Sequence, residues 1–435
     1  MREFWLNLPA LTQDILLLLT LIAPGLIAGL LVLRGLRAWP LAGAMLRRFA
    51  WVNVLFVALI AISVGVGVAL LAQERGLRQG SARAAEKFDL IVAAPGSEVT
   101  AMLAAVYLQP SDMALISGAQ YDEIAKTEGV ALAAPIAFGD SYQGAPVVGT
   151  TADFVTHLAG DLADGRIFQT ESEAVAGAFA PVALGEEITP AHGHGPATED
   201  DAHAGAHYTI TGRMAPTGSP WDRAILVPVE GVWSVHGLPN GHAAGDSRIG
   251  PPFVAEYMPG TPAVLVRAQE LWGNYALKSR FTRDDMMGFF PGTVLAQLHG
   301  LMGEVRSAMS LMSVLTQVLV TLSVLIGLMI LVRLIARSLA LLRAIGAPLR
   351  FVFAVVWSYS AALIVTGAAL GLGFGVVMAR VISGIVTART DVLVQAGLSW
   401  PELHLVAGFV SLTLLIALIP AWAATRRPLL SDLRN

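Results

Sequence analysis

The chain has 435 residues, of which 55% are hydrophobic and only 14% are charged. Soluble globular proteins carry about a quarter charged residues, so this composition excludes a protein that lies wholly in water. The absence of cysteine excludes disulfides, thiolate metal centres and cysteine nucleophiles. The formal net charge is −4, but acidic and basic residues are distributed unevenly along the chain.

Five uncharged apolar stretches occur along the chain. Each is close to the roughly 20 residues that cross a bilayer core. Their backbone groups must be satisfied internally in lipid, which predicts helices. The stretches are residues 15–33, 51–73, 307–332, 351–379 and 405–424.

The first stretch is interrupted by Pro24 and Gly25, which predicts a kinked span or a helix lying in the membrane interface. A cleaved signal peptide is the alternative interpretation. It is disfavoured because arginines follow the apolar run and a small-x-small cleavage site does not.

Basic residues predict the orientation. Residues 34–48 and 333–350 each contain four arginines and no acidic residue, and the C-terminal tail holds three arginines against one aspartate. The positive-inside rule places these segments in the cytoplasm. The N-terminus is then expected outside, and five crossings bring the C-terminus inside.

Residues 74–306 fall on the outer side in this arrangement. They carry 27 acidic and 14 basic residues, a net charge of −13. This charge disfavours nucleic acid as a partner, and the length suffices for an independent core. We therefore expect a multi-pass protein of the bacterial inner membrane with a large periplasmic domain.

The outer region is predicted to be an α+β domain inserted between the second and third helices. Helices are expected at 77–87, 111–128 and 294–306, and strands at 88–94, 208–212, 224–229 and 262–267. The helices that enter and leave the domain are expected to form a stalk.

Six of the nine histidines lie between positions 192 and 242, most of them in a loop, residues 190–207, that has almost no large apolar residue. Imidazoles among carboxylates suit Zn²⁺, and also copper or nickel. The alternative is a solvated low-complexity insertion that meets metal only weakly. The candidate ligands are His192, His194, His203, His207, His236 and His242.

Motifs for enzyme chemistry are missing from the sequence. There is no His-Glu-x-x-His and no Gly-x-Ser-x-Gly, and none of the three lysines follows a glycine as a phosphate-binding loop requires. We expect no intrinsic enzyme activity or cofactor.

Gly367, Gly371 and Gly375 recur every four residues in the fourth apolar stretch. Such a strip allows close helix approach, either within one subunit or across a dimer. The interiors of the apolar stretches lack ionisable residues, which argues against an ion or proton pathway.

Two predicted cytoplasmic segments carry a family resemblance. The first reads Arg-Ser-Leu-Ala-Leu-Leu-Arg-Ala-Ile-Gly-Ala over 337–347, and the second begins Pro-Ala-Trp-Ala-Ala-Thr-Arg-Arg-Pro at position 420. Both resemble signatures of the MacB/FtsX-type ABC transporter permeases, which include the LolC/LolE lipoprotein-release proteins. The layout of one helix, a large domain and three helices is also similar.

The resemblance implies a coupling helix that docks on a separate cytoplasmic ATPase, which would bind ATP. The residues concerned are Leu342, Arg343, Ala344, Ile345, Gly346 and Ala347. It also implies a dimer with a second permease copy or homologue, and mechanotransmission to the periplasmic domain. A periplasmic binding protein or lipoprotein is a further expected partner, besides membrane lipid.

Two features depart from the family pattern: Ser338 replaces a glutamate, and the first apolar stretch is additional. The expected organisation is an extra helix in 1–36, a lead-in and second helix in 37–73, the periplasmic domain in 74–306, and three helices in 307–435 with the coupling segment at 333–350. The fold class is a membrane α-helical protein with four core transmembrane helices, one extra N-terminal helix and the inserted α+β domain.

Three functions remain open at the level of sequence. The first is a permease subunit that exports or extracts a lipoprotein, peptide or hydrophobic compound, with a link to zinc supply. The second is an FtsX-like regulator of a periplasmic hydrolase. The third is a membrane-anchored metal sensor or store, which would need no ATPase.

Overall fold

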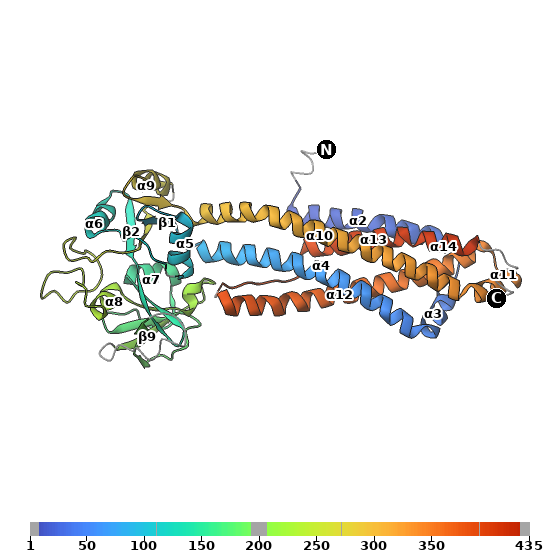
Figure 1. Cartoon of the computed structure of the whole chain (residues 1–435), viewed down its shortest axis with the longest axis horizontal. Coiled ribbons are helices and arrows are strands. Elements are labelled where there is room, and N and C mark those ends of the chain that lie inside the picture. Colours follow the sequence, from blue (N-terminus) through green and yellow to red (C-terminus); the bar gives the residue numbers. More distant parts are fainter. Residues whose placement is uncertain (1–7, 110, 193–206, 271, 391, 427–435) are drawn as a thin grey trace. The chain divides into compact units, whose positions relative to one another are not determined.

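The computed structural model describes residues 8–109, 111–192, 207–270, 272–390 and 392–426 (Figure 1). The chain divides into two compact units. The helical unit comprises Met1–Leu77, Gly303–Gly384 and Gln395–Asn435, and the α+β unit comprises Arg78–Met302 and Ile385–Val394.

The helical unit is built from long apolar helices. Its elements are α2 (Ala10–Leu33), α3 (Trp39–Arg48), α4 (Ala50–Ala85), α10 (Pro291–Leu334), α11 (Ala336–Ala344), α12 (Leu349–Thr390), α13 (Trp400–Ile416) and α14 (Leu418–Thr425), of which α4, α10 and α12 continue into the other unit.

Within the described residues, four helical segments are long and apolar enough to cross a membrane. They are Ala10–Leu33, Ala50–Ala85, Leu349–Thr390 and Trp400–Thr425. The remaining predicted stretch lies in α10, where Val314–Ile330 forms a shorter apolar segment. These helices make the chain a membrane protein.

Helix α2 continues through Pro24, so the first apolar stretch forms one helix. The backbone N–H of Gly25 donates to the Ser411 hydroxyl of α13 at 2.9 Å. Gly29 lies against the Trp357 ring, and an added Cβ would approach that ring to 2.9 Å. Small residues thus let α2 pack closely within its own chain.

The glycine strip of α12 lies against α4 of the same chain. A Cβ at Gly367 would approach the Ile60 side chain to 2.7 Å, and one at Gly371 would lie 2.8 Å from the Ala61 carbonyl oxygen. A Cβ at Gly375 would lie 2.7 Å from the carbonyl oxygen of Gly65. The close approach that the strip permits is therefore an internal helix–helix contact.

A buried ion pair fixes the start of α13 to α4. Nη1 of Arg75 donates to both carboxylate oxygens of Glu402, at 2.5 and 2.6 Å, and Nη2 donates to the Gly397 carbonyl. The Glu402 side chain is fully buried and also accepts the Ser399 backbone N–H at 2.9 Å as part of a capping box. The pair is desolvated, so losing either partner would leave a buried charge.

The α+β unit contains two sheets. The first is antiparallel and has the order β12-β1-β11-β2, from Met287–Phe289, Leu90–Ala93, Ala263–Ala268 and Val130–Pro135. The second is mixed and has the order β5-β9-β6-β10-β4-β3-β8, with β7 paired to β9. Its strands are Leu162–Gly165, Tyr208–Met214, Glu173–Ala176, Ile225–Pro228, Ala145–Thr150, Ala137–Tyr142 and Ala191–His192, with β7 at Glu187–Ile188.

Both faces of the central strands are covered. Successive residues of β1 alternate between two apolar clusters, Leu90 and Val92 in one and Ile91 and Ala93 in the other. The helices of this unit are α5 (Glu98–Tyr107), α6 (Gly118–Lys126), α7 (Ala152–Ala159), α8 (Val229–Val235) and α9 (Gly273–Phe281), with a short 3-10 turn at Pro220–Arg223.

The predicted helix over 111–128 is wrong at its start. Ile116 instead exchanges backbone hydrogen bonds with Thr261, at 2.7 and 3.0 Å. Ser117 then caps α6, because its hydroxyl accepts the Gln120 backbone N–H at 3.4 Å. Its own backbone N–H donates to the Gln120 side-chain oxygen at 2.9 Å, which completes a capping box. The helix therefore begins at Gly118.

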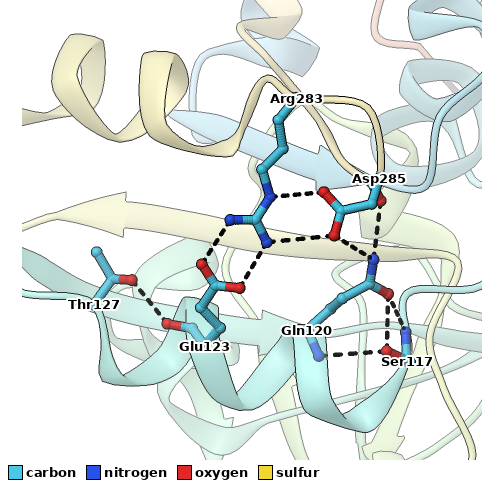
Figure 2. A network of polar contacts seen from close by, with 6 residues as sticks. All are labelled: Ser117, Gln120, Glu123, Thr127, Arg283 and Asp285. Atoms are coloured by element: carbon cyan, nitrogen blue, oxygen red, sulfur yellow. Dashed lines mark hydrogen bonds and ion pairs between the residues drawn. The ribbon is translucent and has the colours of Figure 1, made fainter.

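A polar network joins α6 to the turn after α9 (Figure 2). The Arg283 guanidinium donates to both oxygens of Glu123, at 2.8 and 2.6 Å, and to Asp285 at 2.7 Å. Gln120 donates to the backbone carbonyl of Asp285 at 2.9 Å. The hydrogen bonds from Arg283 hold the carboxyl pKa values of Glu123 and Asp285 below their usual range.

Replacement of Gly371 by alanine should destabilise the helical unit by about 1–3 kcal/mol, because the new methyl group overlaps Ala61 and Val64 of α4. The matched control is Gly373→Ala on the same helix, where nothing lies within 4 Å of the added Cβ. Thermal unfolding of the full chain in detergent measures both. Equal midpoints for the two variants would contradict the packing described for α12.

The network of Arg283 should stabilise the α+β unit less as the pH falls. The folded-state pKa values of Glu123 and Asp285 are lowered, so their contribution is complete above the unfolded-state values near pH 4 and is lost below them. Unfolding of the full chain between about pH 6 and about pH 3 should show a smaller acid loss in a Glu123→Gln/Asp285→Asn double variant than in wild type. An unchanged pH dependence would show that this network does not contribute to the loss of stability at low pH.

Candidate functional site

Helix α11 presents two different faces. Ala336, Leu339 and Ala340 are buried, and Leu339 belongs to the apolar core of the helical unit. Leu341 is 53% exposed on the opposite face. Packing on one side therefore positions the segment that follows and leaves its other side open.

A left-handed glycine ends α11. Gly346 has a φ of +101°, which side-chain-bearing residues rarely adopt. The Ala347 N–H donates to the Leu342 carbonyl at 2.9 Å, and the Gly346 N–H donates to the Arg343 carbonyl at 3.1 Å. This pair of bonds is the Schellman motif. It turns the chain sharply between Arg343 and Ala347.

The turn projects an apolar tip. Ile345 is 83% exposed, and Leu349, at the start of α12, is 49% exposed. Ala344 and Gly346 are also exposed, while Leu342, Arg343 and Ala347 are half-buried. A large aliphatic side chain in this setting, among four arginines, has the character of a contact residue for another protein.

Ser338 occupies the position at which the resembling family has glutamate, and it is exposed on α11. In the second signature segment, the Arg426 guanidinium lies 4.1 Å from the centre of the Trp422 ring. Residues 427–435 of that segment lie outside the described residues.

The candidate histidines are not gathered into one site. Among the described residues, no group of three or more His, Asp or Glu side chains is placed to hold a metal ion. His194 and His203 lie outside the described residues. The backbone of His192 is paired opposite Asp140 in β8, and exposed His207 contacts Thr189 at 2.9 Å through Nδ1.

The other two histidines each meet one carboxylate. Nε2 of His242 lies 3.3 Å from Glu230, and both side chains are 1% exposed. Burial raises the pKa of the Glu230 carboxyl. Nε2 of His236 lies 3.6 Å from Oδ1 of Asp140. Neither acid was predictable from the sequence, because nothing around either residue indicates a partner distant in sequence.

Arg75 and Glu402 were missed as well. A local signal existed for Glu402, since Ser399 followed three residues later by a glutamate is a capping-box pattern. No local sequence pattern indicated its partner Arg75, which lies 327 positions earlier in the sequence.

Residues 310–429 match the model of the FtsX-like permease C-terminal domain. The matched region includes α11, its turn, α12, α13 and α14. A search of curated proteins finds no significant match. The domain match agrees with the two signature segments and with the apolar helices: the chain is a membrane protein that carries an FtsX-like permease C-terminal domain.

Proposed function

We propose that the chain is the permease subunit of an ABC transporter in the inner membrane of a bacterium, with its α+β unit in the periplasm. The FtsX-like domain supports this role, and the family generally works with a cytoplasmic ATPase. The arginine-rich segments at 34–48 and 333–350 support the orientation.

The observation that carries the proposal is the turn after α11. It lies inside the FtsX-like domain, is held by the Schellman bonds of Gly346, and presents Ile345 almost fully to solvent. The ATPase would cover this tip and bind the ATP, while this chain supplies no catalytic group. Arg343 would contribute a charged contact beside it.

The proposed work is mechanical. The turn at residues 343–347, between α11 and α12, is here called the coupling turn. ATP binding in the partner moves these two helices, and the movement reshapes the periplasmic unit. Substrate then need not pass between the helices, which fits apolar stretches without ionisable interior residues. A lipoprotein, peptide or hydrophobic compound is the substrate class proposed, and a second permease copy or homologue completes the subunit pair.

Ile345→Asp should weaken association with the ATPase about thirtyfold or more, because a charged group replaces an apolar contact at the centre of the docking surface. The tagged full chain is purified from its own cells in detergent, and copurifying ATP hydrolysis is measured. The matched control is Phe179→Asp, at a 58% exposed apolar residue of the α+β unit. It should leave the ATPase bound.

Full ATPase association by the Ile345→Asp variant would contradict docking at this turn. A complex that hydrolyses ATP in vesicles but changes the compartment of no lipoprotein or peptide would favour the regulatory function instead. An active chain that never associates with an ATPase would favour the membrane-anchored metal sensor.

A further inference from the structure

A pocket of about 330 Å³ opens in the helical unit, where the ends of three helices meet. Helix α2 ends at Leu33, α12 begins at Leu349 and α14 ends at Thr425. Each of these helices contributes to the wall, so the pocket lies at one end of the bundle. The lining residues are Leu31, Val32, Leu349, Arg350, Phe353 and Thr425.

Most of the pocket wall is apolar. Leu31 is 63% exposed and Leu349 is 49% exposed, while Val32 and Phe353 are half-buried. These residues belong to α2 and α12, two of the helices that are long and apolar enough to cross a membrane. The hydrocarbon tails of lipids are as apolar as leucine side chains. An acyl chain can therefore cover this wall without burying a polar group.

One cation interrupts the apolar wall. The Arg350 side chain lines the pocket and is exposed. No carboxylate among the described residues forms an ion pair with it. A guanidinium is always charged, and its planar fork of N–H donors matches the oxygens of a phosphate group. Arg350 is therefore suited to hold a phosphate at the edge of the pocket.

Further positive charge lies at the same helix ends. Arg34 directly follows α2, and Arg426 directly follows α14. Residues 34–48 and 333–350, which continue from α2 and lead into α12, contain no acidic residue. Basic pockets between membrane helices are suited to anionic lipid headgroups. The charge around this pocket thus complements an anion.

Two tryptophans indicate the depth of the pocket in the bilayer. Trp422 lies one helical turn before Thr425 on α14 and is 50% exposed, and Trp39 at the start of α3 is 51% exposed. Tryptophan is enriched where lipid headgroups meet the hydrocarbon core. A lipid in the pocket would therefore place its phosphate beside Arg350 and its acyl chains along the apolar wall.

We propose that this pocket binds one phospholipid with an anionic headgroup, whose phosphate contacts Arg350. The ligand chemistry is a phosphate joined to hydrocarbon chains, because a free phosphate ion would leave the apolar wall uncovered. In the proposed orientation the site faces the cytoplasmic leaflet. That leaflet assignment rests on the proposed function, whereas the binding itself needs neither the orientation nor an ATPase.

The test measures lipid binding to the purified, delipidated full chain in detergent by native mass spectrometry. The probes are anionic phosphatidylglycerol and zwitterionic phosphatidylethanolamine with identical acyl chains. Wild type should bind the first phosphatidylglycerol about tenfold more tightly, and Arg350→Gln should lose this preference with its charge-assisted hydrogen bond. Arg350→Lys, which keeps the charge, should restore most of the preference.

The matched control is Arg47→Gln, which removes an exposed arginine from the last turn of α3, outside the pocket lining. It should keep the preference. Unfolding midpoints without added lipid show whether each variant keeps its fold. Equal affinity of wild type for the two lipids, or an equal loss in both glutamine variants, would overturn the proposal. Displacement of the lipid by millimolar glycerol phosphate would overturn it as well, because the site would then recognise a soluble phosphate ester.

Discussion

Close backbone contact between α4 and α12 is the constraint on which the helical unit depends. Lipid offers no hydrophobic drive for one apolar helix to join another, so packing must supply the attraction. Gly367, Gly371 and Gly375 of α12 meet carbonyl oxygens and side chains of α4 at distances that leave no room for a Cβ. Gly25 and Gly29 allow α2 to pack closely against the other helices in the same way. The N-terminal helix α2 thus joins the bundle through close packing at small residues.

This packing also supports the helices on both sides of the coupling turn. Helix α12 begins at Leu349, two residues after the Schellman motif ends at Ala347, and α11 is anchored by Leu339 in the same core. A turn held at both ends by packed helices transmits force better than a free loop. The exposed tip at Ile345 is therefore supported by packed helices on both sides, as the proposed mechanical coupling requires.

The sequence predicted features that depend on local pattern. Apolar length located the helices, and short runs of strand-forming residues located strands such as those at 208–212 and 262–267. Features that depend on pairing across the chain were not predictable. Ile116 forms a backbone bridge with Thr261 instead of lying in a helix. Arg75 forms an ion pair with Glu402, which is distant in sequence. Asp140 lies close to His236 only because β3 lies next to α8. Composition suggested one histidine cluster, but the fold distributes the described histidines over separate contacts.

The central claim is that the coupling turn and the α+β unit lie on opposite sides of the membrane. The chain lacks cysteine, so single cysteines introduced by Ile345→Cys and Phe179→Cys are unique labels at exposed positions. The measurement is reaction with a membrane-impermeant maleimide in spheroplasts, before and after permeabilisation. The account predicts that position 179 reacts at once and that position 345 reacts only after permeabilisation. Reaction of both positions from the same side would contradict it.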